Sequence, residues 1–222
     1  MKILKKSNKK ILIYCAVFLI ATLLIWFGYH FPQNNRDEEL KITISENNPS
    51  WNLYENEEYG FSIEFPSDWK IYENYENVSP TINIYLPKKN MNPPFDHFAD
   101  INNVSIFPKG LQTEAVIGNS QKTDINFNFK SDKSLDYVLE DGTIWATYIS
   151  FDSLKDPWKP WGFIWTRNTI YNLTYKCLRG GIKVSLDECN PFDSDQFIRN
   201  GSVDSDIREI EEEIIKTFKF IK

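Results

Sequence analysis

The sequence predicts an α+β fold, with a mainly antiparallel β-sheet packed with helices and one N-terminal transmembrane helix. The sheet is indicated by short segments in which apolar and polar residues alternate, the pattern of a strand with one buried face. A soluble helix is indicated by an apolar stripe at spacings of three and four within residues 203–218. The membrane helix is indicated by residues 11–31, which carry no formal charge.

The clearest strand begins at Phe61, and Phe61, Ile63 and Phe65 alternate there with polar residues. Pro66 ends this run because proline cannot donate a hydrogen bond to a neighbouring strand. Similar patterns predict further strands at residues 70–75, 81–86, 103–107, 125–129, 135–140, 143–151, 163–167 and 170–177.

Two short turns are expected to join neighbouring strands. Asp141-Gly142 predicts a tight hairpin because glycine accepts a positive φ at little cost. Asn168-Thr169 is interpreted as a second hairpin, between the strands at 163–167 and 170–177. Sequential strands joined by such turns run antiparallel.

The helical stripe near the C-terminus has polar signals that suit a helix. Asp206 with Glu209 predicts a capping box at its start. Arg208 with Glu212 and Glu212 with Lys216 form i,i+4 pairs, each contributing about 0.3 kcal/mol. The apolar stripe requires a partner surface, and one face of the sheet supplies it.

The chain divides into four predicted parts: a basic cytoplasmic tail at 1–10, a transmembrane anchor at 11–31, a polar tether at 32–52 and an extracytoplasmic domain at 53–222. The 21 residues of the anchor span about 30 Å as a helix, the thickness of a bilayer core. Five lysines precede it, so the positive-inside rule places the domain outside the cytoplasm. A cleaved signal peptide is the alternative, but no small-residue cleavage site follows the apolar run. The bilayer is therefore an expected partner.

The charge of the chain excludes one class of partner. Beyond the five N-terminal lysines, the remaining 20 basic and 31 acidic residues give a net charge of −11. Such a surface repels phosphate groups, so the sequence argues against nucleic-acid binding.

Two stretches carry a resemblance to a known family. Residues 59–69, reading Tyr-Gly-Phe-Ser-Ile-Glu-Phe-Pro-Ser-Asp-Trp, and the closing residues 214–221 are similar to the start and end of the PsbP-like family. Its plant members are extrinsic photosystem II proteins, and its bacterial members are envelope proteins of mostly unknown role. The resemblance implies an α/β/α sandwich, an antiparallel sheet with helices on both sides. The plant role is not carried over, because no matching ion-binding residues are present.

Cys177 and Cys189 are the cysteines outside the predicted anchor, twelve positions apart. Oxidation is permitted outside the cytoplasm, so a structural disulfide is expected, contributing about 3 kcal/mol in the chain-entropy model. The alternatives are two free thiols, or a metal site, which the lack of a nearby histidine disfavours. No metal site and no cofactor are expected.

Two further groups of residues are candidates for function. Trp158 and Trp161 lie in a proline-rich loop, where exposed rings could bind a glycan or a peptide, although burial in the core is the commoner place for tryptophan. Asp96 and His97 could supply a general base for an envelope hydrolase. No nucleophile or zinc signature accompanies them.

The sequence therefore predicts a single-pass membrane protein that is not an enzyme and that acts as an accessory or binding protein outside the cytoplasm. Its partner is expected to be an unidentified envelope protein or glycan. The hydrolase based on Asp96 and His97 and the binding module based on Trp158 and Trp161 are the alternatives.

Overall fold

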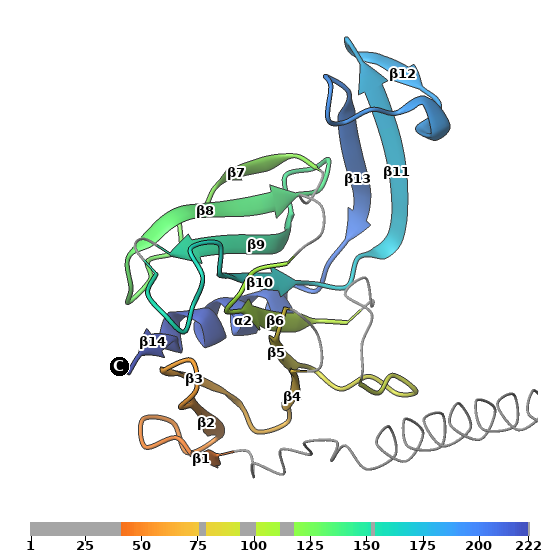
Figure 1. The fold of residues 1–222 in the computed structure, drawn as a ribbon. Helices are drawn as coiled ribbons and strands as arrows, with labels where there is room; N and C mark the ends of the chain where they lie inside the picture. The colour runs from red at the N-terminus through yellow and green to blue at the C-terminus, as the bar shows by residue number, and fades with distance from the viewer. Residues whose placement is uncertain (1–40, 76–78, 94–100, 112–117, 152–153, 222) are drawn as a thin grey trace, which may run out of the picture. The chain divides into compact units, whose positions relative to one another are not determined.

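The computed structural model describes residues 41–75, 79–93, 101–111, 118–151 and 154–221 (Figure 1). The described residues form three antiparallel sheets and one α-helix. The first sheet has the order β1-β2-β3-β14. Its strands are β1 (Ile42–Ile44), β2 (Trp51–Asn56), β3 (Phe61–Pro66) and β14 (Lys219–Phe220).

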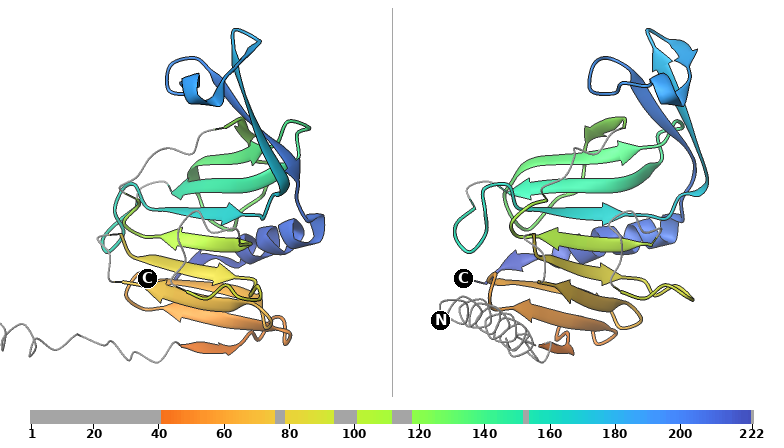
Figure 2. Two further views of the ribbon diagram at one scale, coloured as in Figure 1. Left: turned by 90° about the vertical axis from the view of Figure 1, so that its right-hand side faces the viewer. Right: turned by 45° about the vertical axis from the view of Figure 1, so that its right-hand side comes forward.

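The second sheet is the largest, with the order β4-β5-β6-β10-β9-β8-β7 (Figure 2). Its strands are β4 (Lys70–Asn74), β5 (Thr81–Tyr85), β6 (Asn103–Phe107), β7 (Ser120–Lys122), β8 (Ser131–Val138), β9 (Ile144–Phe151) and β10 (Phe163–Arg167). Most of these strands confirm the alternation found in the sequence. The predicted hairpin at Asp141-Gly142 is also confirmed: it joins β8 to β9, and Gly142 has φ of 88°.

The third sheet has the order β12-β11-β13 and extends away from the second sheet (Figure 1). It contains β11 (Tyr171–Arg179), β12 (Ile182–Val184) and β13 (Gln196–Ser202), with the 3-10 helix η1 (Leu186–Glu188) after β12. We call residues 171–202 the arm and residues 177–195, at its far end, the tip.

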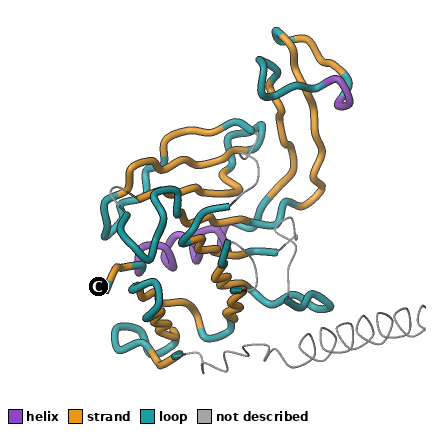
Figure 3. The backbone as a smooth tube through the Cα atoms, in the orientation of Figure 1, coloured by secondary structure: helices purple, strands orange, loops and turns teal. Residues whose placement is uncertain are grey.

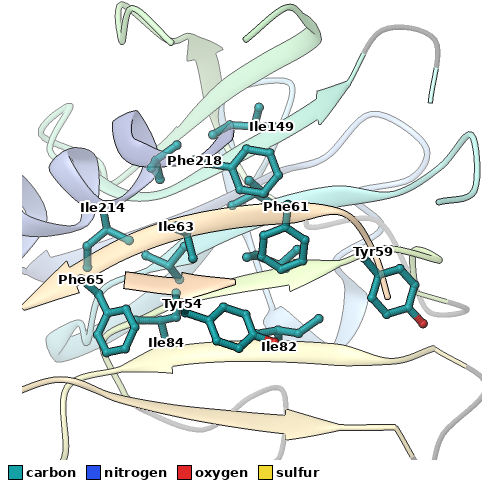
Figure 4. Packing of buried hydrophobic residues seen from close by; sticks show 14 of the residues in the cluster. Tyr54, Tyr59, Phe61, Ile63, Phe65, Ile82, Ile84, Ile149, Ile214 and Phe218 are labelled. Carbon is teal, nitrogen blue, oxygen red and sulfur yellow. The ribbon is translucent and has the colours of Figure 1, made fainter. Parts of the chain in front are cut away.

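The hydrophobic core lies where β3, the second sheet and the helix α2 (Ser205–Thr217) pack together (Figure 4). Phe218, which follows α2, stacks on Phe61 with ring centroids 5.3 Å apart and lies 5.4 Å from Phe151. Ile214 and Ile215 of α2 are fully buried in the same cluster. The alternating residues of β3 and the helical stripe thus meet in one core, as their periodicities require.

The predicted α/β/α sandwich is wrong. Among the described residues α2 is the one α-helix, drawn as the longer purple segment in Figure 3. It packs on β3 and β6. A mostly antiparallel β structure results, because sheets rather than helices cover most of the core. The helix itself was predicted correctly, but its N-cap is Asp204, not Asp206. The Asp204 carboxylate accepts hydrogen bonds from the backbone N–H groups of Asp206 and Ile207, at 3.0 and 3.3 Å.

The predicted transmembrane helix finds no support in the structure. In the described part of the chain no helix is long and apolar enough to cross a membrane. Residues 11–31, where that helix was predicted, lie outside the described residues.

The strand predicted at 125–129 is wrong. These residues connect β7 to β8 as a loop, and β8 already pairs with β7 and β9. Phe127 and Phe129 nevertheless pack on the core, and the Phe129 ring lies 5.2 Å from that of Phe151. The alternation at 125–129 therefore reflects the packing of two aromatic side chains on the core, and the backbone there pairs with no neighbouring strand.

The hairpin predicted at Asn168-Thr169 is also wrong. β10 pairs with β6 on one edge and β9 on the other, so neither edge is open to β11. Asn168 and Thr169 are buried instead: the Asn168 amide donates to Glu211, and the Thr169 N–H donates to the Asn102 side chain at 2.7 Å. The chain leaves the second sheet after this pair, and β11 pairs with β12 and β13.

Candidate functional site

The base of the arm is attached to the second sheet through Arg199 of β13. Its guanidinium lies over the Trp145 ring at 4.8 Å and near the Phe197 ring at 5.3 Å, which are cation–π contacts. Burial lowers the pKa of Arg199 from its usual value, but arginine stays charged. The Arg199 carbonyl also accepts a hydrogen bond from the Glu140 N–H at 2.9 Å. These contacts fix the position of β13 relative to the second sheet.

Glu140, in the turn between β8 and β9, makes a second attachment. Its carboxylate pairs with Lys176 of β11 and accepts a hydrogen bond from the Asn200 amide of β13 at 3.2 Å. One acidic side chain thus holds both long strands of the arm. The arm is therefore held in position by contacts with the second sheet and its β8–β9 turn, in addition to the pairing of its own strands.

The tip is closed by the disulfide between Cys177 and Cys189, which confirms the predicted pairing. Their Cα atoms are 5.9 Å apart, within the usual range for a disulfide. The bond joins β11 to the residue after η1, so it ties the connection that follows β12 back onto the sheet. Cys177, Cys189 and Asp195 lie close together, but sulfurs joined to each other offer a metal no thiolate.

Arg179 and Asp195 form a second closure of the tip. Two guanidinium nitrogens of Arg179 donate to the two carboxylate oxygens of Asp195 at 2.9 and 2.8 Å. Arg179 also donates to the Glu188 carbonyl at 2.7 Å, and the Asn190 N–H donates to Asp195 at 2.8 Å. The hydrogen bond from Arg179 lowers the pKa of Asp195 to about 2. A planar bidentate pair of this kind adds geometric specificity to the charge attraction.

We expect the ion pair at the tip to open in acid. The pKa of Asp195 is lower in the folded chain than in the unfolded one, so its stabilisation is complete above the unfolded value of about 3.9. This stabilisation is lost as pH falls through about 2. The protection factor of the Asn190 N–H, measured by NMR amide exchange and corrected for the intrinsic rate at each pH, should fall over this interval in the wild type. In Asp195→Asn exchange should already be fast at neutral pH, and equal protection in both chains would contradict the assignment.

The tip carries three large apolar side chains exposed to solvent. Ile182 is 74% exposed, Leu186 is 47% exposed and Phe192 is 67% exposed. They come from β12, η1 and the loop before β13, so the closures described above hold all three segments together. Large apolar side chains that a closed element leaves exposed to water are candidates for an interaction site.

The part of β11 before the tip carries a second set of exposed large side chains. Tyr171, Leu173 and Tyr175 of β11 are exposed to between 37% and 48%. The Tyr175 ring packs beside Phe197 at 5.2 Å, which leaves Tyr171 and Leu173 more available to a partner. The sequence alternation at 170–177 suggested one buried face, whereas apart from Cys177 the residues on that face are exposed.

The structure separates the two tryptophans predicted as a binding pair. Trp158 is only 3% exposed, packs against Phe61 and Phe151, and donates its Nε1–H to the Tyr59 carbonyl at 2.7 Å. Trp161 is 62% exposed and donates to the Lys109 carbonyl at 2.6 Å. Trp158 therefore belongs to the core, and the two rings offer no shared platform for a glycan.

The predicted general base lies outside the described residues, because residues 94–100 include both Asp96 and His97. The buried ionic cluster in the described part of the chain involves other residues. Arg208 of α2 pairs with Glu212 and lies 3.9 Å from the Asp136 carboxylate of β8. Glu211, one residue before Glu212, is fully buried, and burial raises its pKa well above the usual value. This cluster holds α2 against the second sheet.

The exposed residues of the tip were missed by the sequence interpretation. Ile182 and Leu186 fall in a short alternation with Val184, but Asp187, Glu188 and Pro191 interrupt that pattern before Phe192. The available signal was the disulfide loop itself, because a short cross-linked segment with few apolar residues cannot bury them in a core of its own.

Comparisons with protein-family models, with curated proteins and with solved structures found no match to this chain. The resemblance to the PsbP-like family stays a prediction, and the sandwich that it implied is not the observed fold. The function is therefore inferred from the residues of the arm.

Proposed function

We propose that this protein is a non-catalytic accessory protein that works outside the cytoplasm and binds a partner through the tip of its arm. The observation that carries the proposal is the exposure of Ile182, Leu186 and Phe192 on an element closed by a disulfide and an ion pair. A partner that covers these side chains gains their apolar burial, about 25 cal/mol per Å².

The fixed geometry of the tip supports a role in binding. A loop that is already ordered loses less conformational entropy on association than a flexible one. The Cys177–Cys189 bond and the Arg179–Asp195 pair both restrain the segment that presents Leu186 and Phe192. Phe192 has the size of a residue that fills a pocket at the centre of an interface.

Two observations support a location outside the cytoplasm. Disulfides persist in oxidising compartments and are rare in the cytosol. Five lysines also lie among residues 1–10, directly before the uncharged residues 11–31, a pattern typical of exported proteins. Association of that segment with a bilayer stays a prediction from the sequence.

The proposal is tested by site-specific photocrosslinking in the native host. A photoreactive amino acid at Leu186, in the full-length chain, should yield an adduct with another cell component. The same group at the exposed Lys122 of β7 serves as the matched control. Adding Ile182→Ser and Phe192→Ser should reduce the Leu186 adduct at least about tenfold, because two anchor side chains are lost.

Two results would count against this function. Equal adducts from Leu186 and Lys122 would mean that the tip has no special role in binding. An adduct that survives both serine substitutions would mean that the apolar side chains do not carry the interaction.

A further inference from the structure

The charges of the tip restrict what kind of partner it fits. Asp187 and Glu188 lie in η1, Asp193 lies just after Phe192, and all three are exposed. The tip has two basic residues, Arg179 and Lys183. Arg179 is paired with Asp195, so Lys183 is the one basic residue that can offset the charge of the exposed acidic residues. Arg179 also donates to the Glu188 backbone carbonyl at 2.7 Å, so the end of η1 lies beside the ion pair. The exposed apolar side chains therefore share the tip with an excess of negative charge.

This combination disfavours a lipid surface as the occupant. Cytoplasmic and bacterial membranes that carry anionic lipids attract basic segments, and each acidic residue near such a surface is repelled. A loop that inserts into lipid is expected to surround its apolar residues with lysine or arginine. Here three exposed acidic residues accompany Ile182, Leu186 and Phe192. A second copy of the same tip is disfavoured for the same reason, because like charges would meet.

We propose that the tip binds a protein partner through an apolar pocket whose rim carries lysine or arginine. This inference rests on the proposed function and adds the chemistry of the partner. Phe192, the one aromatic residue of the tip and 67% exposed, enters the pocket. The carboxylates of Asp187, Glu188 and Asp193 meet the basic rim, which directs the partner to the tip and fixes its orientation.

The test uses a phage-displayed library of random peptides selected on the purified full-length chain. Peptides that bind should be enriched in aromatic or aliphatic residues together with lysine or arginine, relative to the unselected library. Asp187→Lys, Glu188→Lys and Asp193→Lys combined should weaken the selected peptides about tenfold or more, because three attractive contacts become repulsive. Asp68→Lys, Asp132→Lys and Glu209→Lys combined serve as the matched control, with an equal charge change at exposed sites elsewhere.

A second measurement needs only the wild-type chain, so it does not depend on whether the lysine variant folds. With the wild-type chain, raising NaCl from about 50 mM to about 500 mM should weaken binding of the selected peptides, because salt screens exposed charges. Peptides without enrichment in basic residues, or binding indifferent to salt and to the lysine variant, would overturn the inference. Binding of the chain to vesicles of phosphatidylcholine and phosphatidylglycerol, lost with Phe192→Ser, would also overturn it in favour of lipid.

The failure of this inference is distinguishable from failure of the proposed function. If the selected peptides still bind after Ile182→Ser, Leu186→Ser and Phe192→Ser, the tip is not the binding site and both proposals fail. If these substitutions abolish binding but the charge variant does not, the tip is the binding site and only the inference of a lysine or arginine rim on the partner is contradicted.

Discussion

Replacing Trp158 by alanine is expected to lower the free energy of unfolding by about 3–5 kcal/mol, the usual range for removing a buried aromatic side chain. The ring packs against Phe61, Phe151 and Phe220, with centroids 5.9, 5.3 and 5.5 Å away. The substitution also removes the hydrogen bond that Trp158 Nε1–H donates to the Tyr59 carbonyl. Chemical denaturation of the full-length chain, followed by far-UV circular dichroism, measures the loss.

Trp161→Ala is the matched control, because it removes the same side chain from the same loop. Trp161 is mostly exposed, so the expected loss is within about 1 kcal/mol. Equal losses for the two variants would contradict the assignment of Trp158 to the core. A Trp158→Phe variant should fall between them, because phenylalanine keeps much of the apolar volume and loses the hydrogen bond to Tyr59.

The second large effect is expected from Arg208→Met. Arg208 is buried and lies beside Glu212, beside Asp136 at 3.9 Å, and within electrostatic range of Glu211. Methionine keeps much of the apolar volume but leaves buried acidic groups without their cation. Removing one partner of a buried ionic cluster costs about 3–5 kcal/mol. Denaturant unfolding at neutral pH measures this loss, and a loss below about 1 kcal/mol would contradict the ionic role of Arg208.

Glu211→Gln is the control for the ionic cluster, and its effect depends on pH. Burial raises the pKa of Glu211 in the folded chain above its unfolded value of about 4.3. Stability from this group is therefore complete below that value and is lost as pH rises through the folded pKa. Glutamine can still accept the hydrogen bond from Asn168 and does not ionise. As pH rises above the unfolded value, the free energy of unfolding should therefore fall less in the variant than in the wild type.

Local patterns predicted the strands well where a strand joins the central part of a sheet. The segments beginning at Phe61, Thr81 and Asn103 form strands within a residue of the expected bounds. The alternation of Ile125 and Phe127 failed because packing of two phenylalanines on the core produces the same pattern as a strand. Period two therefore reports which side chains are buried and does not report whether the backbone pairs.

Strand pairing could not be predicted from neighbouring segments. Asn168-Thr169 has the composition of a turn, but both edges of the preceding strand β10 are occupied. The competitor for those edges, β6, comes from about sixty residues earlier in the chain. Only the assembled sheet decides that β11 must leave it and build the arm, and the candidate site depends on that outcome.

The sequence by itself determined the periodicity of most strands, the helix before Phe218 and the possibility of a disulfide between Cys177 and Cys189. These depend on residues close in the chain, or on a chemical capacity that only cysteine has. Tertiary structure alone decided that Trp158 is buried while Trp161 is exposed, and that Phe192 stays in water. The physical reason is that burial depends on which distant surfaces arrive to cover a side chain, and no local pattern contains that information.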